Sequence, residues 1–219
     1  MFSKINPMIA IIDYGVGNLK SVQKAFDALG YSAVVSKDPN VVLEADKVVL
    51  PGVGAFGKSM ESLARAGMVS VVKQVIQSGR PFLGICLGLQ MLFEESAEIF
   101  GAEVFGEQEC LNQGLGVFPG RVLRFPVSEL KVPQIGWNQI KKNKEIPLLH
   151  GVPDGSFVYF VHSYYVKPTD STITACTTHY GFEYCSGIAH HNVTAFQFHP
   201  EKSSQVGLRI LKNFGELRP

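Results

Sequence analysis

A ten-residue segment, Pro81 to Gln90, constrains the fold more than any other part of the chain. It reads PFLGICLGLQ: an apolar stretch, a cysteine between two glycines, and then residues that favour a helix. Glycine has no Cβ, so it lets the backbone turn sharply around an exposed side chain. The pattern predicts a nucleophile elbow with Cys86 at its tip and helix N–H groups that favour a thiolate and an oxyanion. A small buried core cysteine is the alternative interpretation.

A second segment, near the C-terminus, supplies a base and a carboxylate. Residues 193–198 alternate as a β-strand does and run into His199, Pro200 and Glu201. Proline cannot continue a backbone ladder, so we expect the strand to stop and leave the His199 imidazole at the sheet edge. Glu201 could hold one ring nitrogen, as the third member of a triad does. A solvated His–Glu pair is the common alternative, but the cysteine motif favours a triad of Cys86, His199 and Glu201.

Composition limits the class of protein. The chain has 219 residues, 46% of them hydrophobic, so we expect one domain. We place that domain at residues 8–219, with residues 1–7 as an N-terminal extension. Lys and Arg total 20 against 19 Asp and Glu, with no long basic run, which argues against nucleic acid or an anionic membrane as a partner. The sequence therefore favours a small-molecule ligand.

Cysteine usage and the N-terminus indicate the compartment. The four cysteines include no C-x-x-C pair, and a core of this size needs no disulfide scaffold, so we expect reduced thiols. The first seven residues lack the apolar segment of a signal peptide, and no apolar run reaches the roughly 18 residues of a membrane span. We expect a cytoplasmic protein.

The first half of the chain alternates strands with helices, which predicts a doubly wound, mostly parallel α/β sheet. We expect strands at 8–13, 32–36, 47–50 and 82–85, and helices from Asn18 as N-cap to Leu29, near 39–45 and within 60–77. Short strands that extend or flank this sheet are expected at 122–125, 134–140, 157–161, 172–177, 187–190 and 193–198. Residues 203–213 return to helix, and Pro119–Gly120 and Pro147 are expected in loops within the domain.

Other site classes fit the sequence poorly. Residues 52–57 satisfy G-x-G-x-x-G, but Pro51 interrupts the turn and no acidic residue follows at about 20 positions, so we expect no nucleotide site. The six histidines form no metal motif, and His190 and His191 would point to opposite faces of a strand. We therefore expect neither a metal nor a cofactor. The same glycine-rich loop can offer backbone N–H groups to an oxyanion at Cys86.

Several segments, in this order along residues 8–219, are distinctive together: 11–19 (IIDYGVGNL), 50–57 (LPGVGAFG), the elbow, 136–138 (GWN), 160–164 (FVHSY) and 196–203 (FQFHPEKS). They resemble the class I glutamine amidotransferases, and within that class the glutaminase subunit of imidazole glycerol phosphate synthase. One small departure is Ile135, where the family commonly has Met. The resemblance implies a single-domain, doubly wound, flavodoxin-like fold.

The resemblance implies that Cys86, His199 and Glu201 hydrolyse glutamine to glutamate and ammonia through a cysteine thioester. The oxyanion would be held by the Leu87 N–H and by an N–H of the loop Gly52, Val53 and Gly54.

Glutamine recognition, carried over by the family's spacing, falls on Gln90, on Glu98 and on backbone groups of Ser163 and Tyr164. The alternatives are a partly exposed helix residue for Gln90 and a solvated cluster with residues 94–95 for Glu98.

The resemblance also implies a partner, a separate (β/α)8-barrel cyclase that uses the ammonia in histidine biosynthesis. Its products would be imidazole glycerol phosphate and an aminoimidazole carboxamide ribonucleotide. Candidates for the docking face are Asn18, Trp137, Asn138 and Lys202, although the single tryptophan could be a core residue. We expect the isolated chain to be a slow glutaminase, activated when the partner reorients the Val53 peptide.

Two other classes of function stay open on the sequence. One is a stand-alone cysteine hydrolase or peptidase of similar fold, against which Gln90 and the sequence from His199 to Glu201 argue. The other is a non-catalytic, flavodoxin-like binding module, which the complete Cys/His/Glu set disfavours.

Overall fold

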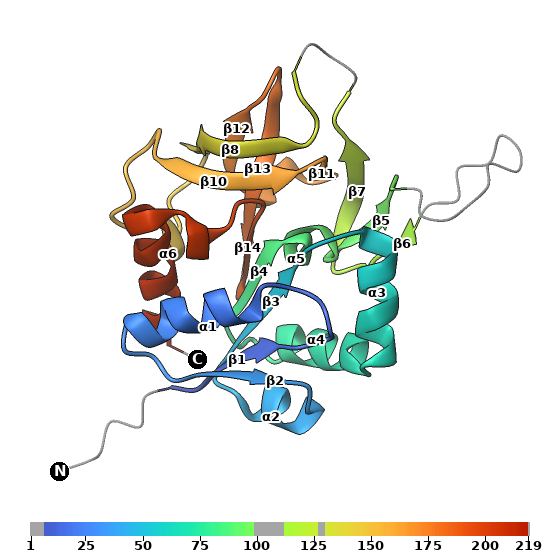
Figure 1. Ribbon diagram of the computed structural model, residues 1–219, viewed down its shortest axis with the longest axis vertical. Helices are drawn as coiled ribbons and strands as arrows, with labels where there is room; N and C mark the ends of the chain where they lie inside the picture. Colours follow the sequence, from blue (N-terminus) through green and yellow to red (C-terminus); the bar gives the residue numbers. More distant parts are fainter. Residues whose placement is uncertain (1–6, 99–111, 127–129, 219) are drawn as a thin grey trace, which may run out of the picture.

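The core of the molecule is a set of short parallel strands. In the computed structural model, which describes residues 7–98, 112–126 and 130–218, they lie in the order β2-β1-β3-β4-β14 (Figure 1). Their bounds are β1 Ile9–Ile12, β2 Ala33–Ser36, β3 Lys47–Gly52, β4 Phe82–Cys86 and β14 Val193–Phe196. Every neighbouring pair is parallel, so the carboxyl ends of β3, β4 and β14 meet at one edge of the sheet. In open α/β sheets, ligand-binding and active sites form at this edge.

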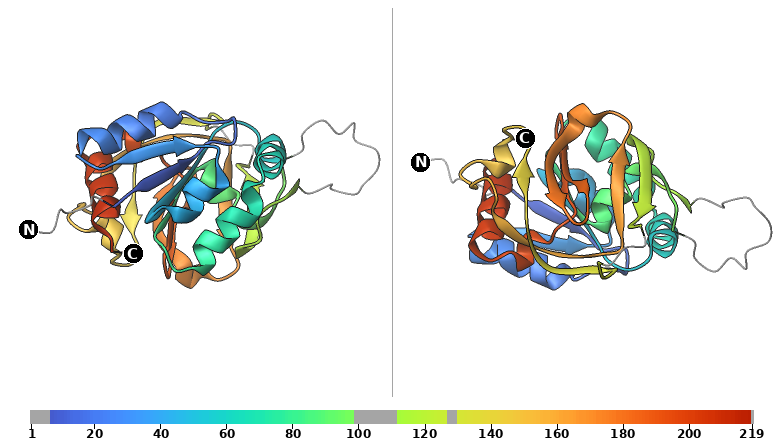
Figure 2. Two further views of the ribbon diagram at one scale, coloured as in Figure 1. Left: turned by 90° about the horizontal axis from the view of Figure 1, so that it is seen from below. Right: turned by 90° about the horizontal axis from the view of Figure 1, so that it is seen from above.

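Helices cover both faces of this core (Figure 2). α1 (Leu19–Ala28) and α6 (Ser204–Glu216) pack on the face that carries Ile9 and Ile11 of β1. The opposite face, with Ala10 and Ile12, carries the helices α2 (Pro39–Glu44), α3 (Phe56–Arg65) and α4 (Met68–Gln77). Because successive side chains of a strand point to opposite faces, an unbroken apolar strand such as β1 serves both layers.

The second half of the chain extends the sheet beyond β14. The added strands follow in the order β13 (Glu183–His190), β11 (Tyr164–Pro168), β7 (Phe118–Arg124), β5 (Phe93–Ser96) and β6 (Asn112–Gln113). β12 (Thr174–His179) pairs with β13 and with β9 (Lys141–Lys142). Of these contacts, β5 with β7 is parallel and the others are antiparallel.

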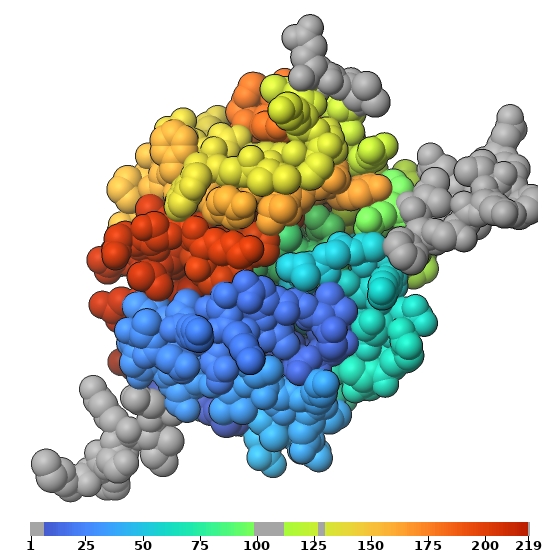
Figure 3. Space-filling model, viewed as in Figure 1, coloured from blue at the N-terminus to red at the C-terminus, as the bar shows by residue number. Residues whose placement is uncertain are grey.

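A separate antiparallel ribbon, β8 (Gln134–Gln139) and β10 (Phe157–His162), lies over the carboxyl edge of the core. In Figure 3 this yellow and orange layer stands above the blue and cyan helices of the first half. The short elements that complete the chain are α5 (Leu87–Gln90), η1 (Pro147–Leu149), η2 (Ser171–Ile173) and η3 (Pro200–Lys202).

The predicted fold class is confirmed, with local differences. Pro147, expected in a loop, begins the short helix η1. The helical region starts at Phe56 instead of Met60, and Gly67, with φ 68°, separates α3 from α4. Pro119 and Gly120 were expected in a loop but lie in β7, where a register shift against β5 accommodates a residue that cannot donate a hydrogen bond. β5, β6, β9 and β11 were not predicted. Of the expected N-terminal extension, only Pro7 lies among the described residues.

Candidate active site

Cys86 occupies the tip of a strained turn between β4 and α5. Its backbone has φ 55° and ψ −109°, and φ above zero is uncommon for a residue with a side chain. Two glycines permit the turn: a Cβ on Gly84 would lie 2.8 Å from Ala195 Cβ, and one on Gly88 would overlap the Leu50 carbonyl oxygen. The elbow predicted from these glycines is present. α5 is only one turn long, so its dipole supports a thiolate less than the sequence suggested.

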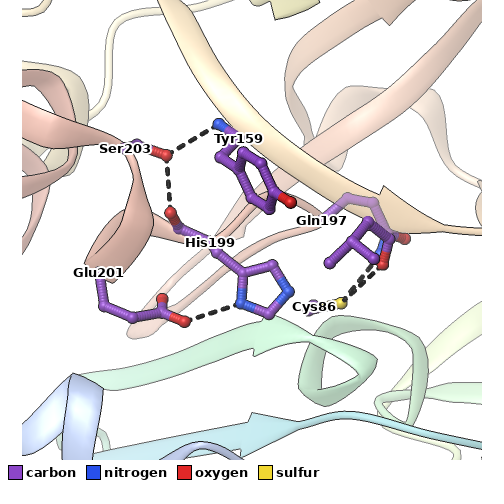
Figure 4. Close-up of polar contacts among 7 residues, drawn as sticks. Cys86, Tyr159, Gln197, His199, Glu201 and Ser203 are labelled. Carbon is purple, nitrogen blue, oxygen red and sulfur yellow. Dashed lines mark hydrogen bonds and ion pairs between the residues drawn. The ribbon is translucent and has the colours of Figure 1, made fainter. Parts of the chain in front are cut away.

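His199 lies beside Cys86 with Glu201 behind it (Figure 4). Its Nδ1 is 2.8 Å from Glu201 Oε1, and both side chains are almost completely buried. The backbone is held from two directions, because the His199 N–H donates to the Tyr159 carbonyl at 2.9 Å and the Ser203 hydroxyl donates to the His199 carbonyl at 2.6 Å. The other ring nitrogen, Nε2, is buried and has no hydrogen-bond partner within the described part of the chain. The ring is thus oriented by Glu201 and leaves Nε2 available.

The charge of His199 follows from these neighbours. Burial by itself would lower the pKa of the imidazole, but its interactions with Cys86 and Glu201 outweigh burial and raise that pKa to about 10. At neutral pH the ring is therefore a cation beside the sulfur and the carboxylate. Such an imidazolium can donate a proton from Nε2.

A cavity of about 390 Å³ opens over Cys86 and His199. The predicted site residues that line it are Val53, Gly54, Cys86, Leu87, Gln90, Glu98, Ser163, Tyr164 and His199. Two predicted residues stand behind this lining: Gly52, which pairs with Cys86 across β3 and β4, and Glu201, which contacts His199. The structure therefore brings the predicted catalytic, oxyanion and glutamine-binding residues to one place.

Gln90 is buried, with 4% of its surface exposed, so the alternative of a partly exposed helix residue is wrong. Its Nε2 donates to the Tyr164 carbonyl and to Gln197 Oε1, both at 3.0 Å. Two acceptors on one amide nitrogen fix the orientation of the carboxamide in the wall of the cavity.

Glu98 is part of the cavity wall and not of a solvated acidic cluster. Its Oε2 accepts a hydrogen bond from the Phe56 backbone N–H at 2.6 Å, at the start of α3. Burial raises the pKa of this carboxyl, and the bond from Phe56 partly opposes that effect. Its expected neighbours are engaged elsewhere: Glu94 accepts from the Gly120 N–H, and Glu95 pairs with Arg121.

With this geometry established, comparison with known proteins decides the family. The family model described as glutamine amidotransferase class-I matches residues 10–216. The chain belongs to the class I glutamine amidotransferases. Within that class it belongs with the proteins named imidazole glycerol phosphate synthase subunit HisH. The Syntrophotalea carbinolica HisH is 55% identical, covering 96% of this chain and all of that protein, and the Geobacter sulfurreducens HisH is 54% identical, covering 96% and 99%.

Solved structures support the same fold. A crystal structure of a Thermoplasma acidophilum protein, described as a putative GMP synthase subunit, superimposes with a TM-score of 0.70 at 20% identity. The match covers 97% of this amidotransferase and 94% of that chain. None of the described helices of the amidotransferase is both long and apolar enough to cross a membrane.

The candidate docking residues of this amidotransferase lie near one another only in part. Trp137, on β8, is 52% exposed, so the core alternative is wrong, and its ring meets the Tyr159 ring edge-on. Lys202 Nζ lies 5.8 Å from the centre of the same Tyr159 ring. Asn138 is tied to the fold by a bond from Nδ2 to the His179 carbonyl at 2.9 Å. Asn18 occupies the N-cap of α1, as predicted, but its side chain makes no capping bond.

One expectation about the histidines is wrong. His190 and His191 do not point to opposite faces, because His191 lies in the turn after β13 with φ 49°, and the two ring centres are 4.1 Å apart. Among the described residues no group of three or more His, Cys, Asp or Glu side chains could hold a metal ion.

Two residues of the site were not predicted, Gln197 and His162. Gln197 is fully buried, and its Nε2 lies 3.7 Å from the Cys86 sulfur. His162 is buried beside the cavity and contacts the Tyr164 carbonyl through Nδ1 at 2.8 Å. A polar residue inside an apolar strand needs partners, so the glutamine between Phe196 and Phe198 was a usable signal. For His162 the sequence alone gave no comparable signal.

Proposed function

We propose that this chain hydrolyses glutamine to glutamate and ammonia with Cys86, His199 and Glu201 as its catalytic residues, and delivers the ammonia to a cyclase subunit. The observation that carries the proposal is the placement of the His199 ring between Glu201, at 2.8 Å, and Cys86 at the floor of a cavity that also contains Gln90.

The reaction begins with attack of the Cys86 thiolate on the side-chain amide carbon of glutamine, which gives a tetrahedral oxyanion. His199 donates its Nε2 proton to the amide nitrogen, the C–N bond breaks, and ammonia leaves behind a γ-glutamyl thioester. His199, now neutral, takes a proton from water as the water oxygen attacks the thioester carbon. Collapse of this second intermediate breaks the C–S bond, releases glutamate and restores the thiolate. Glu201 orients the ring and balances its charge.

The oxyanion is assigned to the Leu87 N–H and to an N–H of the loop Gly52, Val53 and Gly54. Both segments adjoin the sulfur, since Gly52 pairs with Cys86 and Leu87 follows it. Gly54 has φ 91°, a conformation that favours glycine and allows the Val53–Gly54 peptide more than one orientation. A partner that selects the orientation in which the N–H of this peptide points at the oxyanion would raise the rate of glutamine hydrolysis roughly 10²- to 10³-fold.

The partner is assigned as a (β/α)8-barrel cyclase. The relatives named above are described as subunits of imidazole glycerol phosphate synthase, which supports an assembly with a second chain. In that assembly ammonia would be consumed to form imidazole glycerol phosphate and the aminoimidazole carboxamide ribonucleotide. This is a reaction of the cytoplasm, and docking would use the face around Trp137 and Lys202.

The test is steady-state glutamate release by the purified chain alone, with the cyclase, and with the cyclase and its nucleotide ligand. We expect slow release from the chain alone and strong activation in the full mixture. Equal turnover in all three conditions would favour a stand-alone cysteine hydrolase, and no glutamate in any of them would favour a binding module.

A further inference from the structure

We propose that His162 and Gln197 are positioning residues that hold the Gln90 carboxamide in one orientation, and that Gln197 also steadies the Cys86 sulfur. The inference rests on the proposed glutaminase function and extends it to two residues outside the triad. It follows from a chain of buried hydrogen bonds whose donors and acceptors can be assigned from one backbone carbonyl.

The carbonyl oxygen of Tyr164 can only accept hydrogen bonds. Gln90 faces it at 3.0 Å, so the atom there must be the amide nitrogen. The same nitrogen is 3.0 Å from Gln197, which must therefore present its oxygen. Gln197 Nε2 then points at the Cys86 sulfur, at 3.7 Å. A 180° flip of either side-chain amide, which would exchange its oxygen and nitrogen, would break at least one of these three contacts.

The contact with sulfur gives Gln197 a second effect. An N–H donor favours a thiolate over a neutral thiol because it interacts more strongly with the charged form. Gln197 is held in place by its own backbone, whose N–H donates to the Ser186 carbonyl at 2.9 Å, and it is completely buried. It therefore reaches both Gln90 and Cys86 from a rigid strand end.

His162 acts on the other side of the Tyr164 carbonyl. Its Nδ1 lies 2.8 Å from that oxygen, so Nδ1 must carry a hydrogen, and in the neutral ring Nε2 must accept. The group at Nε2 is the Tyr184 hydroxyl, at 3.2 Å. Burial lowers the pKa of His162 to about 4, which keeps the ring neutral at physiological pH. The Tyr164 carbonyl is thus fixed by His162 and in turn fixes Gln90.

The chain of bonds ends at Gln134, the first residue of β8. Gln134 Oε1 lies 3.0 Å from the Tyr184 hydroxyl, while its Nε2 is buried with no hydrogen-bond partner in the described structure. If Tyr184 gives its only hydrogen to His162, the Gln134 amide must turn its Nε2 toward Tyr184, which also satisfies the unpaired nitrogen. The positioning chain therefore ends on the same strand that exposes Trp137.

The first test separates the two effects of Gln197 by steady-state kinetics of glutamate release, measured on the complex with the cyclase and its ligand. Gln197→Glu keeps the acceptor for Gln90 but replaces the N–H at sulfur with a carboxylate. We expect KM for glutamine to change by less than about 3-fold, kcat to fall at least about 10-fold, and the acidic limb of the pH–rate profile to move to higher pH. An unchanged kcat and pH profile would overturn the role at sulfur.

The second test addresses His162. His162→Leu removes the donor to Tyr164 and should raise KM about 10-fold with kcat changed less than about 3-fold. His162→Asn restores an N–H near the position of Nδ1 and should recover most of that loss. Equal kinetics in the two variants, or a loss confined to kcat, would overturn the positioning role. If His162→Leu does not fold, Tyr184→Phe, which removes only the hydroxyl that holds Nε2, should raise KM about 3-fold, and an unchanged KM would count against the proposal.

Thr194→Val is the matched control, because Thr194 is buried on β14 at the end remote from the site. It should retain wild-type KM and kcat. Equal KM values for this variant and for His162→Leu would overturn the proposal. Failure of the inference and of the proposed function are distinguishable. A wild-type complex that releases no glutamate contradicts the function, whereas active variants with wild-type constants contradict only the positioning.

Discussion

His199 depends on its neighbours in two separate ways, one for position and one for charge. Glu201 accepts from Nδ1 at 2.8 Å, and the interactions with Cys86 and Glu201 raise the pKa of the ring to about 10. In Glu201→Gln an amide oxygen can still accept from Nδ1 but cannot balance the imidazolium charge. We expect glutamate release to fall about 10- to 100-fold in Glu201→Gln and about 10²- to 10⁴-fold in His199→Ala. Initial rates measured on the complex test this, and equal losses would contradict the division of roles.

His162 also makes folding stability depend on pH. Its native pKa is lowered to about 4 while the unfolded chain keeps the ordinary value of 6.5, so between these values the unfolded state binds more protons. The free energy of unfolding should therefore fall by about 3 kcal/mol as pH drops from 6.5 to 4. His199 adds nothing in this window because its raised pKa matters only above pH 6.5.

Urea unfolding across this pH range measures the effect. His162→Asn should show a shallower decline than the wild type, and a decline of the same slope in both proteins would rule out His162 as its source.

The site residues that could be predicted are those whose role follows from a short local sequence motif. Cys86 between two glycines and His199 two positions before Glu201 are of this kind. Gln197 and His162 act through partners far away in the chain, since Gln90 and Gln197 are 107 positions apart. A single sequence does not reveal which distant strands will meet.

At the scale of elements, the elbow depends on the close approach of α5 to β3. A Cβ on Gly88 would overlap the backbone oxygen of Leu50, and backbone atoms cannot move aside cheaply. We expect Gly88→Ala to cost about 3 kcal/mol or more of unfolding free energy.

Gly30→Ala is the comparison, because that glycine has φ 83° with open space around its Cβ position, and should cost only about 1 kcal/mol. Denaturant unfolding of both variants measures the two losses of unfolding free energy. A Gly88→Ala cost no greater than that of Gly30→Ala would show that close packing does not define the turn.

The elements of the parallel core followed from periodicity, and the later ones did so less well. β1 and β4 are apolar throughout, and β3 is apolar from Val48 to Leu50, which is typical of strands buried on both faces. β9 and β11 were missed because two residues, or five with little alternation, carry almost no periodic signal. The proline in β7 favoured a loop, but the register shift between β7 and β5 allows the strand to contain it.

At the scale of the whole molecule, the ribbon of β8 and β10 presents an apolar surface next to the cavity, and Val161 of β10 also lines that cavity. Ile135, Trp137 and Phe157 are each more than half exposed on it. We expect Trp137→Ala to weaken binding of the cyclase by about 30-fold or more, since large aromatic anchors dominate such interfaces. Because the side chain is half exposed, folding should be retained.

Calorimetric titration of the two chains measures that affinity. Lys73→Ala is the control and should bind as the wild type does, because Lys73 is an exposed residue of α4, which lies at the opposite side of the molecule. Equal affinity of the two variants would move the docking face elsewhere.

We assign the covalent step to Cys86, and the most direct measurement of this role is the initial rate of glutamate release by Cys86→Ala in the presence of the cyclase and its ligand. The substitution leaves a Cβ in the same strained turn, so the variant should fold and bind its partner like the wild type. We predict a rate at least about 10³-fold below wild type, because Cys86 is the only thiol among the described residues that line the cavity. A folded variant that keeps a tenth of the wild-type rate would contradict the account.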